Sequence, residues 1–287
     1  MRKFSIILSA LIFTSIANAY DLNNGIVTSH ISQSFLVQQP TPLPKTKHKL
    51  VIIAHRGSHL KFPENTLAAY EEAIKEGADY VEIDLRTTKH GQLVIMHDES
   101  TTRMTGKKAL IKDLNYSEIS NLKIKSTDKE DTATYRIPDF KSVLNLCRGR
   151  INIYLDFKDA DVEKAYRLIK EAGMQNNLVV YLNKEEQYGQ WKKVAPGIPL
   201  MASLPENMNI SQLTTLLDKR PVDIVDNAYN DETVNLMHKR KIAVWVDVQS
   251  NDEGPDKWEQ SLKQGVDGLQ TNHLEKLIEY LEEKGIR

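Results

Sequence analysis

The alternation of two sequence patterns most constrains the fold of this chain. From residue 50 onward, short apolar runs rich in β-branched residues are followed by longer segments of helical periodicity. Such alternation over this length predicts a (β/α)8 TIM barrel, whose parallel strands are buried and end at a common edge. Strands are expected at 50–54, 80–85, 92–96, 151–155, 178–181, 199–203, 223–226, 241–247 and 267–270. Helices are expected after Pro63, after Ile137 and at 161–172, 184–195, 209–218, 231–240, 256–264 and 273–284.

These nine candidate strands are one more than the barrel needs. The link between the second and third candidates, residues 86–91, is too short for a crossover helix, which needs a dozen residues or more in the whole connection. A hairpin turning at His90-Gly91 would account for the surplus strand. After the third strand, residues 99–136 are polar and loop-rich, with a possible short helix at 117–122. We expect a small insertion at the mouth of a site.

Polar side chains capable of catalysis accompany the first three candidate strands. His55 and Arg56 follow the first, and His97 follows the third. Glu82 and Asp84 lie two residues apart on the second, so both carboxylates point to the same face. Two such acids repel each other unless a hard cation with oxygen ligands, such as Ca²⁺ or Mg²⁺, neutralises them. Because barrel proteins place their sites at the strand exits, this coincidence predicts a site there.

Each motif also has a simpler structural interpretation. A His-Arg-Gly sequence after a strand is commonly a turn, a Glu-x-Asp pair is commonly a solvated strand face, and His97-Asp98 resembles a strand-end pair. Isolated motifs of this kind need structural context before they indicate chemistry. Their joint occurrence at one predicted edge favours a functional site over three separate structural features.

The ordered motifs resemble one enzyme family. The series His55-Arg56-Gly57, Pro63-Glu64-Asn65-Thr66, Glu82-Ile83-Asp84 and His97-Asp98 is similar to that of the glycerophosphodiester phosphodiesterases, a metal-dependent branch of the phospholipase C-like phosphodiesterase barrels. The resemblance extends over about residues 50–282. It implies a phosphoric diester hydrolase of lipid metabolism that converts small glycerophosphodiesters to glycerol 3-phosphate and an alcohol, with one divalent cation, Ca²⁺ or Mg²⁺.

The resemblance also implies a set of metal ligands. Where the family commonly has Glu-x-Lys after the fourth strand, this chain has Asp156 and Lys158. Glu82, Asp84 and Asp156 would therefore hold the cation. Aspartate is one methylene shorter than glutamate, a change that flexible Ca²⁺ coordination tolerates better than Mg²⁺ coordination. Taken alone, Asp156 has a second interpretation as a helix-capping acid.

The remaining implied roles concern the substrate. His55 and His97 would act as an acid–base pair on opposite sides of phosphorus, since imidazoles titrate near neutrality. Arg56 and Lys158 would bind the phosphate, whose negative charge grows in the transition state. Trp245 lies in a segment similar to the family's Val-Trp-Thr-Val-Asn strand and would pack on the glycerol, although alone it reads as a core residue. The sequence does not indicate which histidine is the acid and which is the base. It also does not indicate whether water or an internal hydroxyl of the glycerol attacks the phosphorus.

Two other functions are compatible with the sequence. A related barrel phosphodiesterase would act on intact phospholipid, in the manner of a phosphatidylinositol-specific phospholipase C or a sphingomyelinase D. A non-catalytic barrel would bind anionic metabolites, because fold alone does not fix function. Turnover of a water-soluble diester separates the first prediction from both alternatives.

The N-terminus has the three-part pattern of a secretory signal peptide. Arg2 and Lys3 precede an apolar run at 4–16, and Ala17-Asn18-Ala19 forms a small-residue cleavage site. The run is shorter than the roughly 20 residues that cross a bilayer, so we expect a periplasmic or secreted protein without a stable membrane anchor. After residues 1–19, residues 20–48 are expected to form an irregular lead-in to a barrel domain at 49–287.

Charge and cysteine content restrict the partners. The formal net charge is −1, and removing Arg2 and Lys3 makes it about −3. This balance favours binding to neither nucleic acid nor an anionic membrane surface, which both need basic clusters. The single cysteine, Cys147, forbids an internal disulfide, so an exported chain relies on its core. The sequence does not indicate an oligomeric state.

Overall fold

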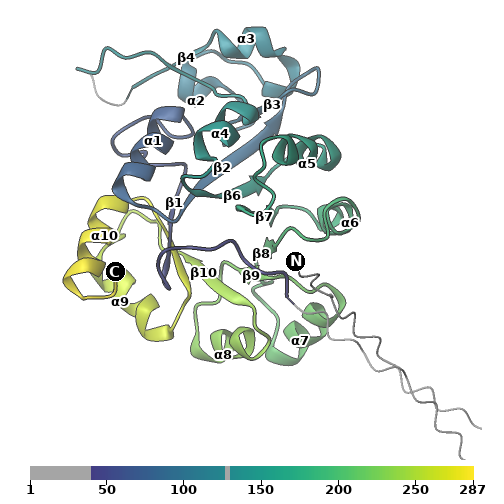
Figure 1. The fold of residues 1–287 in the computed structure, drawn as a ribbon, viewed down its shortest axis with the longest axis vertical. Helices are drawn as coiled ribbons and strands as arrows, with labels where there is room; N and C mark the ends of the chain where they lie inside the picture. Colours follow the sequence, from purple (N-terminus) through teal and green to yellow (C-terminus); the bar gives the residue numbers. More distant parts are fainter. Residues whose placement is uncertain (1–39, 127–129) are drawn as a thin grey trace, which may run out of the picture. The chain divides into compact units, whose positions relative to one another are not determined.

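The barrel is formed by eight parallel strands of a nine-stranded sheet in the computed structural model, which describes residues 40–126 and 130–287 (Figure 1). The predicted signal peptide and residues 20–39 lie outside these described residues. The eight strands are β1 (Val51–Ala54), β2 (Tyr80–Thr87), β6 (Asn152–Phe157), β7 (Leu178–Leu182), β8 (Leu200–Ala202), β9 (Ile224–Val225), β10 (Ala243–Asp247) and β11 (Gly268–Thr271). Parallel pairing of β1 with both β2 and β11 closes the ring. The predicted (β/α)8 fold is confirmed.

Helices surround the ring of strands (Figure 1). They are α1 (Leu67–Glu76), α4 (Phe140–Cys147), α5 (Val162–Glu171), α6 (Glu185–Val194), α7 (Ile210–Lys219), α8 (Asp231–Lys239), α9 (Pro255–Gln264) and α10 (Leu274–Glu283). Several begin at a polar cap: the side chains of Thr66, Asp139 and Asp161 each accept a hydrogen bond from a backbone N–H in the first turn. Cys147 is a buried free thiol on α4. No helix within the described ranges is long and apolar enough to cross a bilayer.

The ninth strand, β3 (Leu93–Ile95), is outside the ring and antiparallel to β2. This confirms the predicted hairpin and corrects the expectation that His97 follows a parallel strand. His97 nevertheless reaches the barrel mouth because the hairpin folds back along β2. The backbone N–H of Met96 donates to the carbonyl of Asp84 at 2.9 Å, which brings the next residue level with the Glu82 and Asp84 carboxylates.

The segment between β3 and α4 packs as a small subdomain beside β3. It contains α2 (Thr102–Thr105), the 3₁₀ helix η1 (Ile111–Asp113), α3 (Tyr116–Ser120) and a hairpin of β4 (Lys123–Ile124) with β5 (Tyr135–Arg136). Its apolar cluster joins the following side chains: Val94, Met96, Ile111, Leu114, Ile119, Ile124 and Ile137. The outer face of β3 is therefore buried by this segment. Burial on both faces explains why the sequence of β3 resembles that of a barrel strand.

The core has two layers, because successive strand residues point alternately into the ring and toward the helices. Ile52 packs in the layer beneath the helices, whereas Ile53 packs inside the ring. Trp245 is also inside, with its ring centroid 4.9 Å from that of Tyr80. Gly268 allows this arrangement, since a Cβ there would lie 2.7 Å from Trp245 Cδ1.

The described part of the lead-in lies across the N-terminal end of the barrel. Leu43 packs against the interior cluster, and Asn152 at the start of β6 donates to the carbonyl of Lys45 at 2.9 Å. Thr41 N donates to Asp223, just before β9. These contacts cover the end of the ring opposite to the strand exits.

Candidate active site

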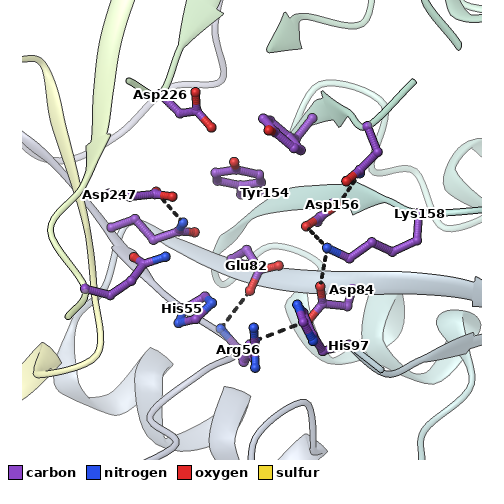
Figure 2. A pocket seen from close by; sticks show the side chains of 14 residues that line it. His55, Arg56, Glu82, Asp84, His97, Tyr154, Asp156, Lys158, Asp226 and Asp247 are labelled. Carbon is purple, nitrogen blue, oxygen red and sulfur yellow. Dashed lines mark hydrogen bonds and ion pairs between the residues drawn. The ribbon is translucent and has the colours of Figure 1, made fainter. Parts of the chain in front are cut away.

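A pocket of about 250 Å³ opens at the C-terminal ends of the barrel strands (Figure 2). Every described residue that lines it carries a polar group. The lining residues are His55, Arg56, Glu82, Asp84, His97, Tyr154, Asp156, Lys158, Tyr181, Asn183, Asp226, Asp247, Gln249 and Gln270. The pocket thus joins seven of the eight predicted site residues.

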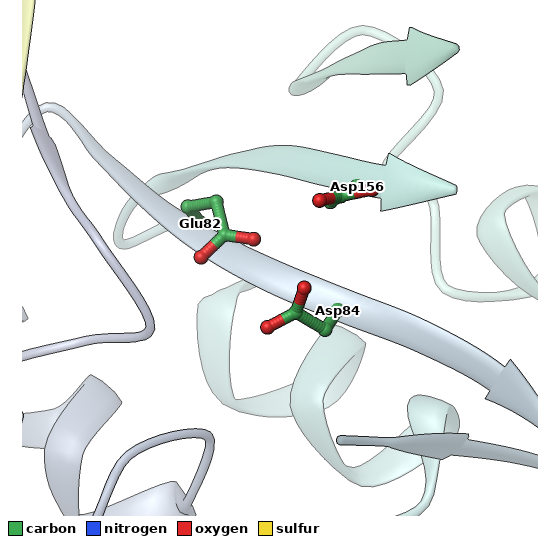
Figure 3. Close-up of side chains that lie close together, drawn as sticks. All are labelled: Glu82, Asp84 and Asp156. Atoms are coloured by element: carbon green, nitrogen blue, oxygen red, sulfur yellow. The ribbon is translucent and has the colours of Figure 1, made fainter. Parts of the chain in front are cut away.

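Three carboxylates converge on one side of this pocket (Figure 3). Glu82, Asp84 and Asp156 each offer an oxygen, and these oxygens lie within 4.8 Å of one another. The register explains the grouping, because Asp156 on β6 stands directly opposite Asp84 on β2. Three carboxylate oxygens at this separation form the hard donor set that Ca²⁺ and Mg²⁺ prefer.

Electrostatics in the cluster favour a bound cation. Burial raises the pKa of Glu82 well above its usual range, and the neighbouring Asp84 and Asp156 raise it further. Burial and Asp84 likewise raise the pKa of Asp156. Asp84 is fully buried, and its Oδ1 atom accepts no hydrogen bond but forms an ion pair with Lys158 Nζ at 3.1 Å. The residues therefore fit a divalent ion, whose charge would favour their ionised forms.

Lys158 is held between two of these acids. Its ammonium pairs with Asp84 and also donates to Asp156. Burial opposes the charge on Lys158, but the surrounding carboxylates raise its pKa above the usual value. The lysine remains charged, and Figure 2 shows its ammonium between the two aspartates.

Arg56 occupies the turn after β1. Its backbone N–H donates to Glu82 Oε2 at 2.8 Å, its Nε atom lies 3.5 Å from Asp84 Oδ2, and its Nη1 donates to Glu64 Oε1 at 3.0 Å. The turn is tight: Arg56 has φ of 55°, and a Cβ at Gly57 would lie 2.8 Å from the backbone of Ala69. The His-Arg-Gly motif thus gives a turn that also carries a charged group into the pocket.

His55 is partly buried and hydrogen-bonded to an amide. Its Nδ1 atom lies 2.7 Å from Asn272 Oδ1, which only accepts, so Nδ1 carries the hydrogen and Nε2 has a free lone pair. Burial, followed by the nearby Arg56 charge, lowers the pKa of His55 to about 4. Its imidazole is neutral at pH 7.

His97 is more exposed and is paired with a carboxylate. Its Nδ1 atom donates to Asp98 Oδ1 at 2.9 Å. Arg103 on α2 donates to both oxygens of Asp98, at 2.7 and 3.0 Å, and also to both oxygens of Glu64. The Arg103 hydrogen bonds lower the pKa of Asp98 to about 2 although burial opposes this. Because Glu64 also binds Arg56, a chain of ion pairs connects the two predicted site residues His97 and Arg56.

The prediction for Trp245 is corrected. It lies in the interior cluster of the ring, 2% exposed, and does not line the pocket. The alternation along β10 gives the reason: the next inward residue toward the strand exit is Asp247, and this side chain reaches the pocket instead.

Several residues that line the pocket or hold its side chains were missed from the sequence. Asn65 donates to Asp84 Oδ2 at 2.7 Å, and Asn272 binds His55. Asp226, Asp247 and Gln270 line the opposite side. All except Asn65 lie at the end of a predicted strand or just after it. Their position at the strand ends is the feature of the sequence that could have identified them as site residues.

Comparison with known proteins agrees with this geometry. The chain matches the Glycerophosphoryl diester phosphodiesterase family over residues 55–196. It is 28% identical over 250 residues to the Glycerophosphodiester phosphodiesterase of Caldanaerobacter subterraneus, covering 83% of this chain and 100% of that protein. The similarity to this enzyme extends along its whole length. The matched range contains all the predicted site residues except Trp245. The enzyme class and the family resemblance predicted from the sequence are confirmed.

Solved structures of glycerophosphodiester phosphodiesterases share the fold. The enzyme from Agrobacterium tumefaciens superposes with a TM-score of 0.69 at 24% identity, covering 79% of this chain and 97% of that one. A phosphodiesterase from Oleispira antarctica, solved in complex with the product sn-glycerol-3-phosphate, gives a TM-score of 0.70 at 21% identity, covering 81% and 96%. At these identities the structures support the barrel architecture of the family.

Proposed function

We propose that this protein hydrolyses glycerophosphodiesters to glycerol 3-phosphate and an alcohol. One observation carries the proposal: the Glu82, Asp84 and Asp156 oxygens lie within 4.8 Å of one another in a pocket that also contains two histidines and two permanent cations. The product bound to the Oleispira antarctica phosphodiesterase supports the same product for this chain.

Glu82, Asp84 and Asp156 would hold one divalent cation, Ca²⁺ or Mg²⁺. When bound, the cation supplies a Lewis acid for a phosphoryl oxygen. Arg56 and Lys158 provide further positive charge beside the carboxylates, where it stabilises the negative charge that grows on the non-bridging oxygens.

The two histidines have environments that suit opposite tasks. His55 is neutral, and Asn272 fixes its Nδ1–H, so its Nε2 lone pair accepts the proton of the attacking hydroxyl as a general base. The Asp98 carboxylate accepts a hydrogen bond from His97 Nδ1, which orients the ring and leaves Nε2 as the nitrogen that can transfer a proton. His97 therefore acts as the general acid that protonates the leaving alkoxide.

The pocket lining favours a water-soluble diester over an intact phospholipid. None of the described residues that line the pocket is aliphatic. Long acyl chains need apolar contacts, whereas the phosphate, the glycerol and a small alcohol make polar ones.

The test is release of glycerol 3-phosphate from purified protein incubated with glycerophosphoethanolamine, glycerophosphocholine or glycerophosphoglycerol. The protein is treated with a chelator and then supplied with Ca²⁺, Mg²⁺ or Mn²⁺. We expect release only with an added metal. No release from any diester with any metal, together with hydrolysis of intact phospholipid vesicles, would replace the proposal by a lipid phosphodiesterase.

Export is a second part of the proposal. The N-terminal pattern of Arg2, Lys3, the apolar run at 4–16 and Ala17-Asn18-Ala19 supports cleavage and a periplasmic or secreted product. N-terminal sequencing of the protein recovered outside the cytoplasm should begin at Tyr20. Recovery of the uncleaved chain in the cytoplasm alone would contradict export.

A further inference from the structure

The pocket has a second group of acids, opposite the carboxylate cluster of Glu82, Asp84 and Asp156. Asp226 follows β9, Asp247 ends β10, and Gln270 lies on β11. Gln249, just after β10, completes this group, which we call the acidic end. Figure 2 shows Asp226 and Asp247 on the far side of Tyr154 from Asp156 and Lys158.

The acidic end contains buried acceptor atoms that receive no hydrogen bond from the described residues. Asp226 is 6% exposed and Gln270 is 5% exposed. Asp226 Oδ1, Gln270 Oε1 and Gln249 Oε1 are buried and have no hydrogen-bond partner among the described residues. Buried polar atoms of folded proteins are nearly always paired, so three unpaired acceptors lining one pocket indicate a ligand that donates hydrogen bonds.

The donors available within the acidic end are already used. Gln270 Nε2 donates to Asp247 Oδ1 at 2.6 Å, and Ser203 Oγ donates to Asp226 Oδ2 at 3.0 Å. The donors to both carboxylates are neutral: Gln270 for Asp247, and the hydroxyls of Ser203 and Tyr181 for Asp226. Among the described residues, no lysine or arginine is one of the main groups that act on the charge of Asp226 or Asp247.

The charge of the whole pocket points to a cationic ligand. Its lining has five carboxylates and two permanent cations, Arg56 and Lys158. With all five carboxylates ionised, a divalent ion in the carboxylate cluster and a phosphodiester with one negative charge leave two negative charges in excess. Burial and the neighbouring Asp226 raise the pKa of Asp247 to about 7, as expected for a carboxyl group without a counter-charge.

We propose that the acidic end binds a primary ammonium group on the alcohol of the substrate, so that the preferred glycerophosphodiesters are those of a primary amino alcohol such as ethanolamine. This inference rests on the proposed function. A primary ammonium carries three N–H donors for the unpaired acceptors, and its charge reduces the negative excess. A trimethylammonium group has the charge but no N–H donor, and a polyol has donors but no charge.

Tyr154 provides a further contact for such a group. Its side chain is buried between the carboxylate cluster and the acidic end (Figure 2). It is one of the residues that line the pocket. A neutral aromatic face beside a carboxylate is a favourable surface for an ammonium ion.

The first experiment compares kcat/KM of the metal-loaded full chain for glycerophosphoethanolamine, glycerophosphocholine and glycerophosphoglycerol. We expect the ethanolamine diester to exceed each of the others by about tenfold, the ratio given by one charge-assisted contact of about 1.4 kcal/mol. Equal values for the three diesters would overturn the inference while leaving the proposed function intact.

Two isosteric variants assign the preference to the acidic end. In Asp247→Asn and Asp226→Asn, the ratio of kcat/KM for the ethanolamine and glycerol diesters should fall toward one. Asp218→Asn, which removes an exposed carboxylate on α7, is the matched control and should keep the wild-type ratio. A wild-type ratio in both pocket variants would overturn the inference.

A binding measurement keeps the inference testable without turnover. Calorimetric titration of the full chain with O-phosphoethanolamine and with phosphocholine should give about tenfold tighter binding of the primary amine. Equal affinities would overturn the inference even for an inactive protein. If the variants fail to fold, as judged by circular dichroism, this comparison on the wild-type chain decides alone.

Discussion

The two sides of the pocket differ in how their carboxylates are compensated. On the side of β2 and β6, Asp84 and Asp156 face the Lys158 ammonium, and Asp98 beside His97 is bound by Arg103. On the side of β9 and β10, Asp226 and Asp247 are paired with neutral donors only among the described residues. The hydrogen bonds from Arg103 lower the pKa of Asp98, beside the pocket, to about 2, whereas burial and Asp226 raise that of Asp247 to about 7.

The difference indicates a division of tasks. The compensated side has the groups that bind a metal ion, hold a phosphate and transfer protons. The uncompensated side has buried acceptors that receive no hydrogen bond from the described residues. We therefore expect changes on the first side to abolish turnover for every diester, and changes on the second side to alter the choice of diester and the pH dependence of stability.

The largest effect is expected at the histidines. His55→Ala and His97→Ala should each lower kcat by about 100- to 10,000-fold, the usual contribution of a general acid or base. His90→Ala, at the exposed hairpin turn, is the control and should keep wild-type activity. Circular dichroism should show that all three variants remain folded. Substantial activity in either pocket variant would contradict the assigned acid–base pair.

Asp247 should make stability depend on pH. Because its pKa is raised from 3.8 to about 7, the folded state binds more protons than the unfolded state within this window. The free energy of unfolding should therefore fall as pH rises from about 4 to 7, by at most about 4 kcal/mol from this group. Asp247→Asn removes the effect, so its stability relative to wild type should be greater at pH 8 than at pH 4.5.

Urea unfolding at both pH values, in metal-free and amine-free buffer, measures this difference. Asp231→Asn, at the exposed start of α8, serves as the control and should not show it. If wild type and Asp247→Asn differ by the same free energy at pH 4.5 and pH 8, Asp247 is compensated and the contrast between the two sides is wrong.

A moderate effect is expected at Arg103 in the insertion. Arg103→Ala leaves Asp98 and Glu64 without their shared guanidinium, so His97 and Arg56 lose their common support. We expect kcat to fall about tenfold, with Arg103→Lys intermediate because an ammonium cannot reproduce the planar fork. Arg136→Ala in the same insertion should have no effect on kcat. An Arg103→Ala enzyme with wild-type kcat would show that the ion-pair chain has no role in positioning.

The smallest effect is expected at Trp245. As an interior residue, Trp245→Phe should lower the free energy of unfolding by about 1–3 kcal/mol and leave KM unchanged. Chemical denaturation and steady-state kinetics measure the two quantities. A severalfold increase in KM without loss of stability would restore the substrate contact expected from the sequence.

The barrel could be predicted from the sequence because parallel strands buried on both faces give continuous apolar runs. The same property made residues 92–96 look like a barrel strand. Val94 and Met96 are buried by the insertion rather than by the packing of a barrel strand. The apolar periodicity of the sequence is the same in both cases. Only the short link to β2 indicated the hairpin.

The carboxylate cluster was predictable because two of its ligands share one strand and are recognisable at a spacing of two. The acidic end was missed because its two acids, Asp226 and Asp247, come from different strands and so form no pair at a spacing of two. Asn272 lies 217 residues from its partner His55, a distance that no local pattern spans. Trp245 was wrongly predicted to contact the substrate. Its depth inside the barrel depends on how all the strands are staggered relative to one another, which the local sequence does not show.

The most direct test of the metal site is calorimetric titration of the chelator-treated full chain with Ca²⁺ and with Mg²⁺, beside the variants Asp84→Asn and Asp267→Asn. We predict one divalent cation per wild-type chain and no binding in Asp84→Asn. Asp267→Asn is the control and should bind one cation like the wild-type chain, because its carboxylate lies before β11 and outside the pocket. Wild-type binding in Asp84→Asn, or no binding of either ion to the wild-type chain, would contradict the assignment of Glu82, Asp84 and Asp156 as the metal site.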